Sequence, residues 1–280
     1  MKLRPGFAAA LYLFLATLAP SIAPTAFAQP EAGQVGGPRK YLFLINVDLK
    51  PLQGDAFSRA ESGEVQALHA NNAPGHYLGM WAITGSDHVL FVSGFDSFAD
   101  LQKDHDARAA MPKLADAMKT GDAAEASLVA DTHSSIYKYD EDLSLRAPVD
   151  LSKTRFMRIV LFHVRSGHDK DFEHVVKLFA KAYDSIPEAH WAMFEKMYGL
   201  GSDNTYILVT PMASLSDVDV MIGSGKKFSD STGEDQLSLL RQQADADVES
   251  SEADLFALGP NISYVPESWL TASPDFWGKK

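Results

Sequence analysis

The side chains best placed to do chemistry in this sequence lie in predicted strands. His163 belongs to the strand-like run 156–165, and Glu195 shares a face with Trp191 in the run 190–198. A histidine and a carboxylate that reach the same ligand can exchange protons with it as general base and general acid. We therefore predict that His163 and Glu195 form a catalytic pair in an aromatic-lined cavity.

Four further side chains are predicted to bind the ligand. Arg165 shares a strand face with His163, and Trp191 shares one with Glu195. Asp48 and Trp81 stand at corresponding positions, 115 and 114 residues before His163 and Glu195. Charged groups and aromatic rings on an otherwise apolar face are typical of a pocket for a small molecule.

Structural explanations compete with these assignments. Polar residues at strand ends commonly just meet water, tryptophans are commonly core, and Glu195 beside Lys196 is compatible with an exposed pair. His76 and His190 follow prolines in two corresponding turns, so we expect a repeated structural role for them, such as a hydrogen bond that fixes the turn.

The composition excludes several classes of site. The chain has no cysteine, which excludes disulfides, thiolate-bound metals and a cysteine nucleophile, and its net charge of −12 argues against nucleic-acid binding. His105 has no second histidine at metal-binding spacing, and no phosphate-loop, dinucleotide or serine-hydrolase motif is present. His174 falls off the apolar stripe of its predicted helix, which weakens it as a haem ligand. We therefore expect no metal and no cofactor.

The first 28 residues have the features of a secretory signal peptide. Lys2 and Arg4 precede an apolar run, which is followed by the Ala-Phe-Ala sequence ending at Ala28. The apolar run is too short to span a bilayer, which needs about 20 residues. We predict cleavage after Ala28, a linker over 29–39, and a soluble periplasmic or secreted protein with no membrane insertion.

The elements that must position these side chains are predicted in the same order twice. The first repeat, 40–147, has predicted strands over 41–49, 77–84, 88–95 and 132–139, and helices over 55–70, from Ser97, and over 112–130. The second repeat, 148–270, has predicted strands over 156–165, 190–198, 204–211 and 262–265, and helices over 168–185, 214–222 and 234–249, with a tail over 271–280. Short sequence segments recur in the same order in the two repeats, such as Gly-Ser-Asp at 85–87 and 201–203.

The order β-α-β-β-α-β is that of the ferredoxin-like motif, in which two helices cover one face of a four-stranded antiparallel sheet. The other face must be covered if it is apolar, and the simplest partner is the bare face of the second repeat. We therefore predict an α+β fold in which tandem ferredoxin-like repeats form one pseudo-symmetric α/β barrel with a central cavity.

The pattern of strand, helix, Trp-bearing strand, Gly-Ser-Asp hairpin, strand and Ser-initiated helix resembles the dimeric α/β-barrel superfamily. That superfamily includes the antibiotic-biosynthesis-monooxygenase-like and NIPSNAP-like families, and its chlorite-dismutase-like branch also holds both halves in one chain. The resemblance covers residues 40–266. It implies the fold more specifically than the activity, because members include cofactor-free oxygenases, haem proteins, isomerases and ligand-binding domains.

Three functions follow from this pattern. The first is that the chain binds, or converts without a cofactor, a small apolar or aromatic molecule in the barrel cavity. The second is a non-catalytic binding or assembly module, with a barrel filled by Trp81, Trp191, Phe162 and Met193. The third is a haem-dependent enzyme of the chlorite-dismutase type. The sequence does not decide whether the chain is an enzyme, and it allows a homodimer.

Overall fold

The computed structural model describes residues 38–147, 150–201 and 204–278. The predicted leader, its cleavage after Ala28 and most of the predicted linker lie outside these residues. Within the described part of the chain, no helix is both long and apolar enough to cross a membrane.

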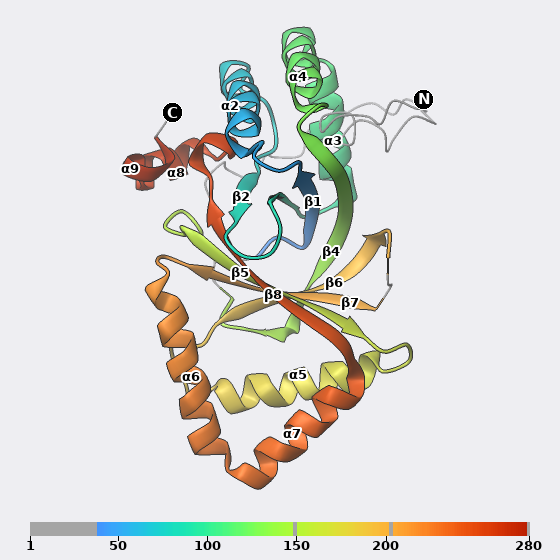
Figure 1. The fold of residues 1–280 in the computed structure, drawn as a ribbon, viewed down its shortest axis with the longest axis vertical. Coiled ribbons are helices and arrows are strands. Elements are labelled where there is room, and N and C mark those ends of the chain that lie inside the picture. The colour runs from blue at the N-terminus through green and yellow to red at the C-terminus, as the bar shows by residue number, and fades with distance from the viewer. Residues whose placement is uncertain (1–37, 148–149, 202–203, 279–280) are drawn as a thin grey trace, which may run out of the picture.

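The two halves of the chain have the same order of elements (Figure 1). The first half contains β1 (Tyr41–Leu49), α2 (Gly54–Ala70), β2 (Leu78–Ala82), β3 (His88–Phe95), α3 (Phe98–Ala109), α4 (Pro112–Glu125) and β4 (Val129–Leu145). The second half contains β5 (Phe156–Val164), α5 (Asp169–Tyr183), β6 (Trp191–Gly199), β7 (Thr205–Met212), α6 (Ser216–Thr232), α7 (Glu234–Asp247) and β8 (Val248–Leu258). The short elements η1 (Pro260–Ile262), α8 (Glu267–Ala272) and α9 (Pro274–Trp277) follow.

The eight strands form one closed antiparallel barrel in the order β1-β3-β2-β8-β5-β7-β6-β4. Each half contributes four consecutive strands, β4-β1-β3-β2 and β8-β5-β7-β6, and the halves join through the β2–β8 and β4–β6 pairs. This arrangement confirms the predicted fold class. The edge strands of each sheet thus pair with edge strands of the other.

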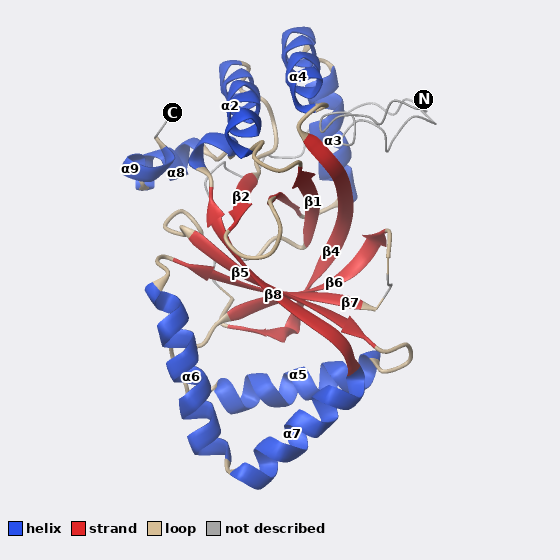
Figure 2. Ribbon diagram, viewed as in Figure 1, coloured by secondary structure: helices blue, strands red, loops and turns tan. Residues whose placement is uncertain are grey.

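The helices lie outside the barrel in two groups, with α2, α3 and α4 on one side and α5, α6 and α7 on the opposite side (Figures 1 and 2). Because side chains alternate along a strand, each strand presents one face to these helices and the other to the barrel interior. Helix α5 shows how the sequence builds the outer layer. Its predicted apolar stripe places Phe172, Val175 and Val176 in the core.

The last strand differs from the prediction. We expected it over 262–265, but β8 is Val248–Leu258, and Tyr264 only forms an isolated bridge with Tyr77. Strand β8 pairs with β5 over its whole length, whereas β2 reaches only its last residues, 256–258. The first part of β8 therefore has an exposed edge. Its sequence is polar, and it lacks the apolar alternation from which a strand is predicted.

The segment after β8, residues 259–277, packs back onto the first half. Ile262 is fully buried, and a Cβ on Gly79 would lie 2.3 Å from the Ile262 carbonyl oxygen, so this approach needs glycine. The predicted tail over 271–280 contains α9, where the buried Trp277 donates a hydrogen bond from Nε1 to the Ser152 carbonyl at 2.7 Å. This segment supplies part of the cavity wall described below.

Candidate functional site

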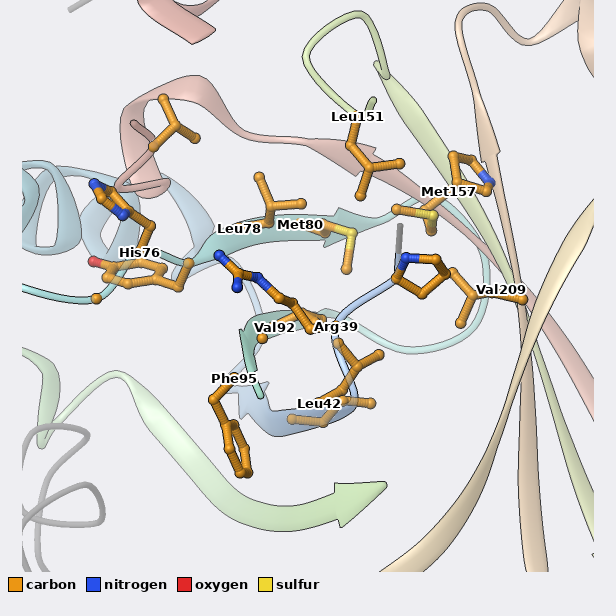
Figure 3. Close-up of a pocket in the computed structure, with 18 of the residues that line it drawn as sticks. Arg39, Leu42, His76, Leu78, Met80, Val92, Phe95, Leu151, Met157 and Val209 are labelled. Carbon is orange, nitrogen blue, oxygen red and sulfur yellow. The ribbon is translucent and has the colours of Figure 1, made fainter. Parts of the chain in front are cut away.

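The barrel interior contains a cavity of about 470 Å³ (Figure 3). Six of the eight strands contribute inward-facing apolar side chains to its wall. These are Leu42 and Leu44, Leu78 and Met80, Val92, Met157 and Ile159, Ala192 and Phe194, and Ile207 and Val209. The volume and the apolar wall fit a small organic molecule.

The rest of the interior is filled. Leu90, Tyr137 and Phe256 are buried in the same apolar cluster as the wall residues but do not line the cavity. The space therefore lies toward one end of the barrel, where β1, β2 and β5 begin and β3 and β7 end.

Arg39 stands at the mouth of the cavity, just before β1 (Figure 3). A Cβ on Gly94 would lie 2.5 Å from the Arg39 Cγ, so the bare backbone of Gly94 makes room for the arginine stem. The Arg39 guanidinium forms an ion pair with Asp96, which also lines the mouth. Its side chain remains 55% exposed, at the edge between cavity and solvent.

His76 lies at the mouth beside Tyr264, with ring centroids 4.8 Å apart. Burial, and after it the charge of Arg108, lowers the pKa of His76 to about 4. The imidazole is therefore neutral near pH 7. Tyr264 is fixed by a hydrogen bond from its hydroxyl to the Ala73 carbonyl at 2.8 Å.

Asp104 of α3 also lines the mouth. Burial raises the pKa of its carboxyl above the usual value, and Arg108 opposes that shift. Arg108 itself donates to the carbonyls of Pro74 and Gly75 at 2.7 and 2.9 Å, which holds the turn before β2. Asp104 accepts no hydrogen bond from any residue that the structure describes.

Trp269 of α8 closes the wall from the C-terminal segment. It is 7% exposed, and its indole N–H is buried without an acceptor among the described residues.

The structure does not bring His163 and Glu195 together. His163 pairs across the strands with Thr205, whereas Glu195 pairs with Tyr206, the next residue on the same strand. Adjacent residues point to opposite faces, so His163 lies on the interior face and Glu195 on the face toward the helices. A catalytic role for this pair therefore stays a prediction that the register does not favour.

The four predicted ligand-binding residues also lie away from the cavity wall. Trp81 packs edge-on against Phe57 of α2, and Trp191 packs edge-on against Tyr183 of α5, both outside the barrel. Asp48 lies on the interior face at the end of β1 far from the mouth. Arg165 is exposed just beyond β5.

These positions bear on the alternative of a filled barrel. Phe162 and Met193 belong to an apolar cluster with Phe172 of α5, so they too face the helices. The four large side chains expected to fill the barrel therefore do not occupy the cavity. His190, in contrast, approaches the carbonyls of Glu188 and Pro211 at 3.0 and 3.1 Å, as expected for a residue that fixes a turn.

Sequence reasoning missed the residues of the mouth. Arg39, His76, Asp104 and Trp269 come from four separate segments, and only the closed barrel brings them together. Trp269 lies at the end of the second predicted repeat, where no short sequence segment recurs between the repeats. The alternation within β1 did contain a usable signal, because Leu42 and Leu44 share one face.

A second group that the sequence analysis missed lies between α2 and α4. Glu61, Glu64 and Glu125 are 0%, 3% and 1% exposed. No described donor reaches either oxygen of Glu61 or of Glu125, or one oxygen of Glu64. Glu61 falls four residues after Phe57 and four before Val65, on the buried stripe of α2, so the spacing alone could have shown it.

Burial is the main cause of the unusual titration of this group. It raises the pKa of Glu64 to about 9 and that of Glu125 to about 8, and it raises the pKa of Glu61 well above its usual value. Glu61 and Glu125 approach within hydrogen-bonding reach, which requires a proton on one of them. The three glutamates are therefore predominantly protonated at neutral pH.

The described residues do not fit a haem in the second half. Phe172 and Tyr206, with ring centroids 4.8 Å apart, occupy the space between the sheet and α5, and Met193 is buried beside them. His174 is exposed on α5. The packing leaves neither room for a macrocycle nor an inward axial ligand at that position.

Within the described chain, one group of side chains lies close enough to hold a metal ion, namely His168, Asp171 and Asp247. The Nδ1 atom of His168 lies 2.9 Å from an oxygen of Asp247 and 3.9 Å from one of Asp171. The short contact is an ordinary hydrogen bond between the residue before α5 and the last residue of α7. Nothing further among the described residues marks an ion site. The expectation of no metal stays a prediction.

Comparison with known proteins supports the fold and leaves the activity open. No protein-family model and no curated protein matches the sequence. Similar solved structures include a "Putative monooxygenase" from Fusobacterium nucleatum, with TM-score 0.52 and 10% identity, covering 78% of this chain and 91% of that one. They also include an anthrone oxidase-like protein, with TM-score 0.50 and 10% identity, covering 80% and 93%. At this identity the likeness is one of fold.

Proposed function

We propose that this protein binds a small apolar or aromatic molecule in the barrel cavity. The single observation that carries the proposal is the 470 Å³ space with its apolar wall and its polar mouth. Displacing water from such a wall favours binding by roughly 25 cal/mol for each Å² of apolar surface buried. The polar mouth would orient the ligand.

The side chains at the mouth are better suited to binding a ligand than to acid–base catalysis. A general base works best when its pKa lies near the working pH. The pKa of His76, about 4, makes it a weak base at neutral pH. Conversion without a cofactor therefore stays the second candidate; the solved structure titled "Putative monooxygenase" shares the fold.

We also propose that the protein acts outside the cytoplasm and belongs to the dimeric α/β-barrel superfamily. The basic, apolar and Ala-x-Ala segments of residues 1–28 support export. The closed barrel of two four-stranded sheets supports the superfamily.

The binding proposal is tested by filling the cavity. Val209 lines the cavity and is only partly buried, so replacing it with tryptophan puts a large ring into the free space (Figure 3). We expect V209W to lower the affinity for the fluorescent probe N-phenyl-1-naphthylamine at least tenfold, with a circular dichroism spectrum like that of the wild type. V220W is the matched control, because Val220 is 47% exposed on α6.

Two results would contradict the proposal. One is unchanged probe affinity in a folded V209W protein, which would place the probe elsewhere. The other is a wild-type protein that binds no probe and carries no retained ligand in native mass spectrometry. If V209W fails to fold, V92W gives the same test from the opposite part of the wall.

A further inference from the structure

The charged groups at the cavity mouth are mostly carboxylates. Among the residues that the structure describes, Asp96, Asp100 and Asp104 line it together with one guanidinium, that of Arg39. Asp96 is the ion-pair partner of Arg39, and Asp100 accepts a hydrogen bond from the Ser97 hydroxyl at 2.6 Å. His76 adds no positive charge at neutral pH, so the mouth is acidic toward a ligand.

Asp104 is the carboxylate left with the fewest partners. Asp104 is half-buried. A Cβ added to Gly75 would lie 3.0 Å from the Oδ2 atom of Asp104, so the carboxylate packs against the backbone of this glycine. No described residue donates a hydrogen bond to it. Arg108 lies beside it, with its Nη2 atom 3.2 Å from the same Cβ position, and its Nε and Nη2 atoms donate to backbone carbonyls. A partly desolvated carboxylate in this state is stabilised by a cationic donor.

The wall around this opening is otherwise largely apolar. Tyr264 contributes to it, and the ring of Tyr264 stacks on that of His76. Carboxylates beside an apolar cavity favour a ligand that joins a cationic group to an apolar part. An anionic head group would meet three carboxylates and a guanidinium that is already paired.

We infer that the ligand is an amphipathic amine, whose apolar part enters the barrel while its ammonium group meets Asp104 at the mouth. This inference rests on the proposed function, because it concerns the same cavity. It assigns Asp104 as the residue that selects the charge of the ligand. The apolar wall selects only size and shape.

The test compares three compounds that share one apolar chain: octylamine, octanol and octanoate. Each is titrated against the N-phenyl-1-naphthylamine complex at neutral pH and low salt. We expect octylamine to displace the probe at a concentration at least about tenfold below that of octanol, and octanoate to bind more weakly than octanol. A charge-assisted hydrogen bond is typically worth about 1.5–3 kcal/mol, which corresponds to tenfold or more.

The variant D104N isolates the carboxylate. We expect it to remove the preference for octylamine and to leave the affinity for octanol within about twofold. D116N is the matched control, since Asp116 is exposed on the neighbouring helix α4 and does not line the cavity. The comparison of the three compounds on the wild-type protein stands even if D104N does not fold.

The outcomes separate the two levels of the proposal. Equal affinity for the three compounds, or preference for octanoate, would overturn the amine inference while leaving cavity binding intact. A preference for octylamine that survives in folded D104N would overturn the role of Asp104. Failure of all three compounds and of the probe to bind would overturn the proposed function itself.

Discussion

At the scale of single residues, glycine decides how closely elements approach one another. Gly121 of α4 is the extreme case, because a Cβ there would lie 1.8 Å from the Oε1 atom of Glu64. The glutamate side chain therefore occupies the space that any other residue at 121 would fill. Gly63 of α2 is the opposite case. It is exposed, and a Cβ added there would have no other atom within 4 Å.

This contrast gives a prediction for a matched pair of variants. We expect G63A to stabilise the protein by about 0.5–1 kcal/mol, because alanine is the better helix former. We expect G121A to destabilise it by about 1–2 kcal/mol, since overpacking a closed interface outweighs that gain. Urea unfolding of both variants measures the difference. Equal stabilisation by both would mean that Glu64 does not lie against Gly121.

At the scale of elements, the α2–α4 pair packs around three carboxyl groups that carry protons. Such groups stabilise the fold only while they stay protonated. In the unfolded chain they ionise near their usual pKa of 4.5, whereas in the folded protein Glu125 and Glu64 hold their protons to about pH 8 and 9. Their contribution is therefore fully present below about pH 4.5 and is lost as the pH rises toward 8–9.

The predicted consequence is that E64Q gains stability over the wild type as the pH rises. We expect little difference near pH 5 and an advantage that grows by up to about 1.4 kcal/mol per pH unit until about pH 9, the pKa of Glu64 in the folded protein. The measurement is urea unfolding at a series of pH values, with E249Q as control, because Glu249 is exposed on β8. A constant difference between E64Q and wild type across this range would show that Glu64 titrates normally.

The elements also show what the sequence could predict. Strand β1, helix α5 and the Ser97 cap of α3 follow from local patterns, and the Ser97 hydroxyl accepts a hydrogen bond from the Asp100 amide at 3.1 Å. The interior face of each strand does not follow from such patterns, because many strands are apolar on both faces. Trp81, Trp191 and Glu195 of the predicted site share the face that closure of the barrel turns toward the helices, whereas Asp48 and His163 lie on the interior face.

At the scale of the whole molecule, the two halves share one closed sheet. The first half contributes Phe57 to the core beneath α2, and the second contributes Phe172 to the core beneath α5. The β2–β8 and β4–β6 pairs connect these two cores through the barrel. Loss of either half would therefore expose unpaired strand edges in the other.

We predict that the protein unfolds in one cooperative transition. F57A and F172A should each lower its free energy of unfolding by about 3–5 kcal/mol and move the same transition. Calorimetry, with near- and far-ultraviolet circular dichroism as independent probes, measures this. Two separate transitions, or a shift confined to one of them, would show that the halves fold independently.

Placing both halves in one chain has a consequence for how the cavity can evolve. In a barrel assembled from two identical chains, every substitution appears twice, so the two ends change together. Here the mouth is lined by Asp104 and the turn before β2 from the first half and by Trp269 from the C-terminal segment. Selection can therefore alter one end of the barrel while the end that carries Asp48 and His163 keeps its inherited sequence.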